Sequence, residues 1–134
     1  MGLTVDDLIE INKTILKTQP HNHSGHHEAI SVNRDTLKEI LDDAKQLESE
    51  FDHAAYVLAS IPWAQPFSGG NKRTAFAAAK IILAEKNYTI ETISEHDIEF
   101  LRKLLFEIQE ERSQINPTTL AKITLYLRKR SMVS

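Results

Sequence analysis

The run from Asn71 to about Glu85 constrains the fold most, because it predicts a helix with apolar residues on nearly every side. A helix of this kind is buried by neighbouring elements over most of its surface. Its alanines allow other helices to pack closely against it. We therefore expect this helix at the centre of an all-α fold. Its apolar residues are Phe76, Ala77, Ala78, Ala79, Ile81, Ile82, Leu83 and Ala84.

A glycine pair precedes this helix and makes its start a candidate anion-binding site. Gly69 and Gly70 allow the backbone to adopt positive φ and to approach a ligand closely. The start of a helix offers unpaired N–H groups and the positive end of the helix dipole. Lys72 and Arg73 would each be disfavoured there by roughly 0.3–1 kcal/mol. An anion beside them would remove that penalty, which favours a phosphate site. The alternative is a basic turn that binds nothing.

The stretch from Gln65 to Ala75, Gln-Pro-Phe-Ser-Gly-Gly-Asn-Lys-Arg-Thr-Ala, resembles the signature of Fic/Doc proteins, His-x-Phe-x-Asp/Glu-Gly/Ala-Asn-Gly/Lys-Arg. Its Asn-Lys-Arg-Thr-Ala ending is most similar to the Doc (death-on-curing) branch. The resemblance implies an all-α, single-domain Fic/Doc-like helical bundle over residues 1–134, with Phe67 anchoring the loop in the core. It also implies that nucleotide phosphates, with ATP as the expected cofactor, are bound by Gly69, Gly70, Asn71, Lys72 and Arg73.

Two positions of this sequence differ from the family's signature in a way that bears on catalysis. At the position of the signature's histidine, the general base, this chain has Gln65, whose amide does not accept a proton near neutral pH. At the position of the acidic residue that helps to hold magnesium, this chain has Gly69. Gln65 is thus a degenerate general-base position, and the loop offers Mg²⁺ no side-chain ligand. The resemblance then implies phosphate binding with impaired catalysis.

Three functions are consistent with these residues. An active Fic/Doc-like toxin would transfer a phosphoryl or AMP group from ATP to a Ser, Thr or Tyr hydroxyl of a target protein. A catalytically impaired relative would bind the nucleotide without efficient transfer, and this is the function that we favour. A non-catalytic interaction protein would use the fold alone. The resemblance also implies an antitoxin as partner, often a flexible segment that folds on binding.

A histidine-rich run lies outside the predicted helices. Four of the six histidines fall between His21 and His27. His23 and His27 have an i, i+4 spacing that would suit a metal site, but Gly25 between them disfavours a helix, and we favour a solvated loop. In the family the corresponding loop lies over the active site. The resemblance therefore adds a third interpretation, in which one of these histidines replaces the base near Gln65.

Composition limits the remaining classes of function. A chain of 134 residues suits one domain. The net charge of −3 and the pI of about 6.1 argue against a dedicated nucleic-acid surface. Arg128 to Arg130 form a local basic cluster, which we interpret as the basic C-terminus of a helix. The chain has no cysteine, no apolar run long enough to span a membrane, and an acidic N-terminus unlike a signal peptide. We expect a cytoplasmic protein.

The rest of the chain predicts further helices, separated by short connections. They are expected from Thr4 to about Lys17, from Asn33 or Asp35 through a buried stripe that ends at Leu47, from about Glu50 to Ile61, from Ser94–Asp97 through Ile108, and from Asn116–Pro117 onward.

The connections between these helices carry their own expectations. Pro62 should end the helix before it, because its ring removes a donor and disfavours helical geometry in the preceding residue. Trp63 either stacks on an adenine or a partner side chain, or packs in the core or at its rim. Asn87 to Ile93 is rich in β-forming residues and is interpreted as a connecting turn or one extended segment, too short for a sheet. Ser131 to Ser134 is expected to fray.

Overall fold

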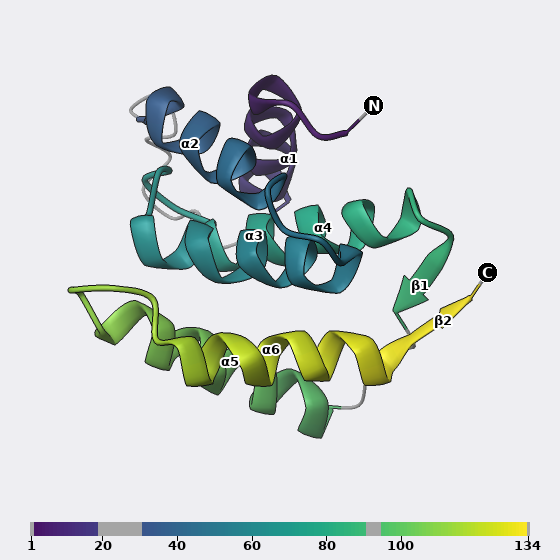
Figure 1. Ribbon diagram of the computed structural model, residues 1–134. Coiled ribbons are helices and arrows are strands. Elements are labelled where there is room, and N and C mark those ends of the chain that lie inside the picture. Colours follow the sequence, from purple (N-terminus) through teal and green to yellow (C-terminus); the bar gives the residue numbers. More distant parts are fainter. Residues whose placement is uncertain (1, 19–30, 91–94, 134) are drawn as a thin grey trace.

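Helices make up most of the described chain, which confirms the all-α expectation (Figure 1). The computed structural model describes residues 2–18, 31–90 and 95–133. Within those ranges the elements follow one another in this order: α1 (Val5–Lys17), α2 (Arg34–Ala44), α3 (Glu50–Ala64), α4 (Asn71–Ala84), β1 (Tyr88–Ile90), α5 (Glu95–Glu110), α6 (Pro117–Arg130) and β2 (Ser131–Val133).

The helices are stacked in three layers, and α3 lies at their centre. Figure 1 shows α1 and α2 on one side, α3 and α4 in the middle, and α5 and α6 on the other side. α3 packs mainly against α2, α4, α5 and α6, whereas α4 packs mainly against α3, α1 and β1. The expectation that the helix from Asn71 is the central one is therefore wrong. The central helix α3 has fully buried residues around most of its circumference: Ala54, Ala55, Val57, Leu58, Ala59 and Ile61.

α4 is buried on one side and open on the other. Ala78, Ala79 and Leu83 are buried in the core, whereas Lys80 is exposed and Ile81 is 36% exposed. The small alanine side chains explain the difference, because each carries little apolar surface whose burial would stabilise the fold. An alanine-rich helix can therefore leave one face uncovered at small cost.

Two helix ends differ from the prediction. α3 continues one turn past Ile61 with Pro62 inside it, and ends where the Gln65 N–H donates to the Ile61 carbonyl oxygen at 2.8 Å. Pro62 is fully buried, and this packing favours the helix over the break that the proline ring alone would produce. α2 ends at Ala44, so Leu47 lies in the following turn, 40% exposed, and is not part of the buried stripe.

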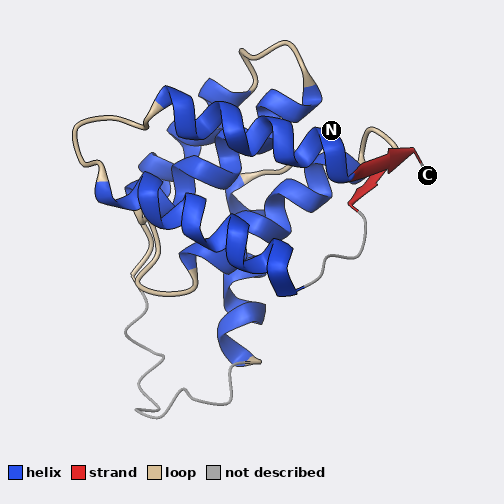
Figure 2. Ribbon diagram, turned by 90° about the horizontal axis from the view of Figure 1, so that it is seen from below, coloured by secondary structure: helices blue, strands red, loops and turns tan. Residues whose placement is uncertain are grey.

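Two segments that were expected to be unpaired form a small sheet. β1 pairs antiparallel with β2, with Tyr88 opposite Val133 and Ile90 opposite Ser131. Figure 2 shows the two strands together at one edge of the helices. The expectation that the segment from Asn87 to Ile93 is too short for a sheet is therefore wrong, and so is the expectation of fraying for residues 131–133. Residues 91–93 and 134 lie outside the described residues. Each strand is too short to be stable alone, and its partner lies more than 40 residues away in sequence.

Side chains cap the starts of several helices as the sequence predicts. The Thr4 hydroxyl accepts from the Asp7 N–H at 3.1 Å in a capping box, and Asn33, rather than Asp35, caps α2. Asn116 caps α6 with Pro117 directly after it. Each cap stabilises its helix by about 1 kcal/mol. None of the helices in the described ranges combines the length and the apolar character that crossing a membrane requires.

Candidate anion-binding site at the start of α4

The backbone of the glycine pair leaves the start of α4 without a side-chain cap. Gly70 is the N-cap residue in the left-handed conformation, with φ 72° and ψ 19°. The first helical bond joins the Thr74 N–H to the Gly70 carbonyl oxygen at 2.9 Å. The N–H groups of residues 71–73 precede that bond, and no side chain caps them. An anion is therefore the natural partner of these groups and of the positive end of the helix dipole.

The two glycines differ in how much room they leave. A Cβ atom on Gly70 would lie 3.1 Å from Asn12 Nδ2 and 3.4 Å from Leu16 Cδ2, and the positive φ disfavours any other residue there. A Cβ atom on Gly69 would meet only Leu16, at an ordinary 3.7 Å. Gly70 is thus required by the packing of α1 against the loop, whereas position 69 accepts a Cβ atom without a close contact.

Asn12 of α1 holds the loop in place, and sequence reasoning missed it. Its side chain is 1% exposed, and its Nδ2 donates to the Gly69 carbonyl oxygen at 2.8 Å and to the Thr74 hydroxyl at 3.0 Å. Its Oδ1 has no hydrogen bond with any residue that the structure describes. The sequence could have indicated Asn12 by its spacing, because this polar residue lies four positions after the apolar Leu8 and therefore on the same, inner face of α1.

Asn71 closes the loop onto itself. Its Oδ1 accepts from the Phe67 N–H at 3.1 Å, and its Nδ2 donates to the Phe67 carbonyl oxygen at 3.0 Å. Phe67 is 3% exposed and belongs to the hydrophobic core, which agrees with its expected role as an anchor. The Asn71 side chain is therefore occupied by the loop, and its backbone N–H is the group that faces a ligand.

The two cationic side chains of the first turn of α4 point to different partners. The Lys72 ammonium donates to Gln109 Oε1 at 2.8 Å and lies 5.4 Å from the centre of the Phe106 ring, so it is held against α5. Arg73 is exposed and makes no hydrogen bond or ion pair with another residue in the described ranges. Arg73 is thus the side chain of this turn that remains available to an anion.

A hollow of about 460 Å³ opens beside Lys72 and Arg73, between α1, α4 and α5. Its floor is apolar, and four cationic side chains surround it. Such a surface suits a ligand or a protein segment that combines an apolar body with negative charge. The lining residues are Ile15, Lys72, Arg73, Phe76, Ala77, Lys80, Leu101, Arg102 and Leu105.

Gln65 is exposed and does not line the hollow beside Arg73. It adopts the left-handed conformation, with φ 51°, and shares a hollow of about 530 Å³ with Asp35 of α2. Val32 forms an isolated bridge with Phe67, and the Asn33 N–H donates to the Pro66 carbonyl oxygen at 2.8 Å. The chain just before α2 therefore runs along the loop.

The histidines proposed as metal ligands or as a substitute base, His21 to His27, lie outside the described residues. Among the residues that the structure does describe, no three acidic, histidine or cysteine side chains lie together as a metal site would require. Magnesium binding through this loop stays a question of the sequence, in which Gly69 stands at the position of the expected carboxylate.

Trp63 packs against the end of α5. Its indole N–H donates to the Glu111 carbonyl oxygen at 2.6 Å. Arg112 donates to the Trp63 carbonyl oxygen at 2.7 Å, and its guanidinium lies 5.3 Å from the centre of the indole ring. These contacts favour the packing interpretation of Trp63 over stacking on a ligand.

One comparison with known proteins finds a family match, which covers about three fifths of the chain. A family model described as the Fic/DOC family matches residues 2–83, a range that includes the loop and nearly all of α4. No curated protein matches the chain. α5 and α6 lie beyond the matched residues, so the family model leaves the partners of Lys72 and Trp63 undefined.

Proposed function

The chain belongs to the Fic/DOC family, and from this premise we propose that the start of α4 binds nucleotide phosphates while catalysis is impaired. The observation that carries the proposal is the uncapped first turn of α4, where Gly70 turns the backbone and Arg73 remains free for a ligand within the described chain. Three N–H groups, the helix dipole and one guanidinium together favour a phosphate over a singly charged anion.

Impaired catalysis follows from the two residues that differ from the signature. The Gln65 amide does not take a proton from a hydroxyl nucleophile, and the loss of a general base slows such reactions by roughly 10²–10⁴-fold. Gly69 has no carboxylate for magnesium, so no step through a metal ion is derived for this loop. Phosphoryl transfer also relies on positioning and electrostatics. These two contributions are all that the remaining groups of the loop supply.

The hollow between α4 and α5 would hold the rest of the nucleotide. Its apolar floor, with Phe76 and Leu105, suits a planar base, and Arg73 borders both this hollow and the helix start. A nucleotide whose phosphates lie at the start of α4 would then extend along the open face of α4. ATP is the ligand that we propose.

Titration with ATP tests the binding proposal. Arg73→Ala should abolish measurable ATP binding and leave the thermal midpoint of unfolding nearly unchanged, because the side chain is exposed and unpaired. Lys122→Ala removes the same charge from the exposed surface of α6 and is the matched control. Equal ATP affinity in the natural protein and the Arg73→Ala variant would remove this arginine from the site.

A transfer assay tests the catalytic part. ATP labelled at the α- or the γ-phosphate is incubated with a cell extract and either the natural protein or the Gln65→His, Gly69→Asp double variant. A Cβ atom at position 69 makes only an ordinary 3.7 Å contact with Leu16, so the first atom of the new side chain does not clash. Label transferred to protein hydroxyls by the variant alone would support an intact phosphate site that lacks its catalytic groups. Label transferred by the natural protein would contradict impairment, and its position would identify phosphoryl or AMP transfer.

A second candidate function, that of a non-catalytic interaction protein, rests on the contacts of Asn71 and Lys72. Asn71 and Lys72 already bind within the chain, to Phe67 and Gln109, which leaves fewer groups for a nucleotide than the signature implies. The apolar hollow with its four cations would then receive an acidic segment of a partner protein, such as an antitoxin. A protein that fails to bind ATP but binds such a segment would be a non-catalytic interaction protein.

A further inference from the structure

The hollow beside Lys72 and Arg73 also carries positive charge farther along α4 from the glycine pair. Lys80 lines it seven residues after Arg73, on the same face of the helix and about 10 Å away along the helix axis. Arg102 of α5 lines the hollow as well. A nucleotide whose only phosphates lie at the start of α4 would leave both of these cations without an anionic partner.

Of these two cations, Lys80 is the one that is available to a ligand. It is exposed and makes no hydrogen bond or ion pair with another residue of the described ranges. The Arg102 guanidinium, in contrast, lies 3.2 Å from a carboxylate oxygen of Glu99. A second anion in the hollow is therefore expected to bind to Lys80.

The Lys80 ammonium is directed over the floor of the hollow. It lies 5.7 Å from the centre of the Phe76 ring, and Phe76 lines the same hollow. Phe76 comes one turn of α4 before Lys80 and about one turn after Arg73, so the lysine side chain points back toward the start of the helix. The ammonium and the free N–H groups of the first turn thus lie near the same stretch of the hollow.

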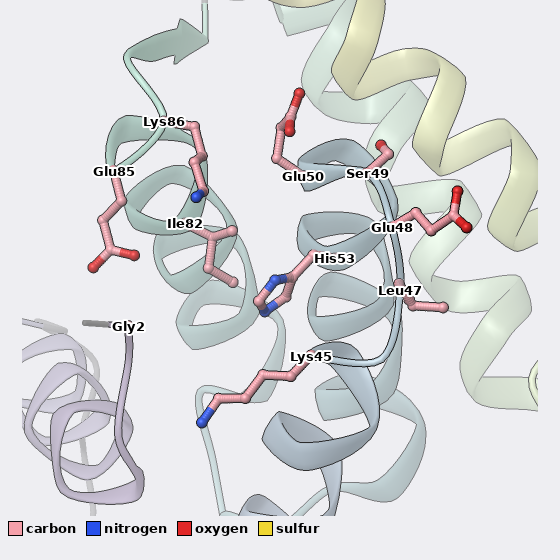
Figure 3. A pocket seen from close by; sticks show the side chains of 10 residues that line it. All are labelled: Gly2, Lys45, Leu47, Glu48, Ser49, Glu50, His53, Ile82, Glu85 and Lys86. Carbon is pink, nitrogen blue, oxygen red and sulfur yellow. The ribbon is translucent and has the colours of Figure 1, made fainter.

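The charge around this hollow selects anions. No acidic side chain lines it in the part of the chain that the structure describes. A hollow of about 660 Å³ at the opposite end of α4 gives the contrast, because Figure 3 shows both glutamates and lysines around His53 there. Mixed charges favour neither sign, whereas the hollow beside Arg73 offers positive charge alone, at two places along one helix.

We propose that Lys80 binds a second phosphate of the nucleotide, carried on the ribose, so that the site accepts nucleotides phosphorylated at the 5′ position and at the 2′ or 3′ position. This inference rests on the proposed function, in which the start of α4 holds the 5′ phosphates. An ammonium binds phosphate through charge-assisted hydrogen bonds. The base would then lie over the apolar floor near Leu105. ATP fits the same site but leaves Lys80 without a phosphate.

Isothermal titration of the full-length protein with AMP, ADP and the 2′,5′- and 3′,5′-bisphosphates of adenosine tests the second phosphate. ADP carries as many phosphates as the bisphosphates and controls for total charge. At least one bisphosphate should bind about tenfold more tightly than AMP, as expected for one added charge-assisted hydrogen bond. Equal affinity for AMP and both bisphosphates would overturn this inference and leave the phosphate site at the start of α4 intact. Absence of binding by all four nucleotides would overturn the proposed function as well.

A lysine variant tests whether Lys80 is the residue that binds the second phosphate. Lys80→Met removes the charge and keeps an unbranched side chain beside Phe76. It should weaken binding of the preferred bisphosphate about tenfold and leave the affinity for ADP unchanged. Lys122→Met on α6 is the matched control and should change neither affinity. Both lysines are exposed, so folding is not at risk.

Two results of this variant series would refute the role of Lys80. An equal loss of affinity for ADP and for the bisphosphate would assign Lys80 to general attraction of anions or to the base. Unchanged affinity for the bisphosphate would place its second phosphate elsewhere. Arg73→Ala should weaken binding of every nucleotide, which separates the site at the start of α4 from the contribution of Lys80.

Discussion

Asn12 and Gly69 are joined by a hydrogen bond of 2.8 Å, from the side-chain amide of a buried residue on α1 to the backbone carbonyl oxygen of the loop before α4. The same amide nitrogen also reaches the Thr74 hydroxyl in the first turn of α4. The Asn12 side chain thus fixes the position of the loop relative to the first turn of α4, where the free N–H groups lie. The precision of any anion site here depends on a residue 57 positions away in sequence.

Replacing Asn12 should loosen this connection. We expect Asn12→Ala to lower the free energy of unfolding by about 1–3 kcal/mol, because two acceptors lose their donor in a poorly solvated place. Hydrogen exchange of the amides from Gly69 to Thr74 should become faster, while the amides of α3 keep their protection. Lys13→Ala, at an exposed position next to it, is the control. A loss of stability without faster exchange in the loop would assign Asn12 a role in packing alone.

The two glycines should respond differently to alanine. Gly70→Ala places a Cβ atom 3.1 Å from Asn12 Nδ2 on a residue with φ 72°. We expect it to destabilise the protein by at least about 1–2 kcal/mol, the usual cost of the left-handed conformation for a residue with a side chain. Gly69→Ala makes only a 3.7 Å contact and should change stability much less. Urea unfolding of both variants measures the difference, and equal effects would contradict the close approach of α1 at Gly70.

The stability of the fold should fall in mild acid through His53. Burial lowers its pKa in the folded state below the ordinary value of 6.5. The unfolded chain therefore binds a proton at a higher pH than the folded chain does. The stability contribution is complete above about pH 6.5 and decreases as the pH falls below that value, until the folded-state pKa is passed. His53→Gln should flatten this part of the curve of unfolding free energy against pH, and a curve of unchanged shape would contradict a lowered pKa of His53 in the folded state.

Lys72 should contribute less to ATP binding than Arg73. Its ammonium is already bound to Gln109 at 2.8 Å and would have to exchange that partner for a phosphate. We expect Lys72→Ala to weaken ATP binding by a smaller factor than Arg73→Ala. Gln109→Ala should release Lys72 and strengthen binding. Isothermal titration of the three variants measures these differences, and a larger loss at Lys72 than at Arg73 would show that the lysine leaves α5 when nucleotide binds.

The sequence by itself determined the local features of the chain. Thr4, Asn33 and Asn116 cap their helices through atoms within three residues, so their positions can be read directly from the chain. The turn at Gly70 and the uncapped start of α4 follow from the same kind of local chemistry. The all-α class and the family signature depend on such short-range patterns, and both were predicted.

Only the tertiary structure decided which residues meet across the chain. The alanine-rich α4 was expected to be the central helix, yet α3 takes that place, because α3 packs against four other helices and buries more of its residues. The pairing of β1 with β2 and the bonds from Asn12 to Gly69 and from Lys72 to Gln109 join segments at least 37 residues apart. No local pattern encodes such contacts, since they form only when packing of the core brings distant side chains to within hydrogen-bonding distance.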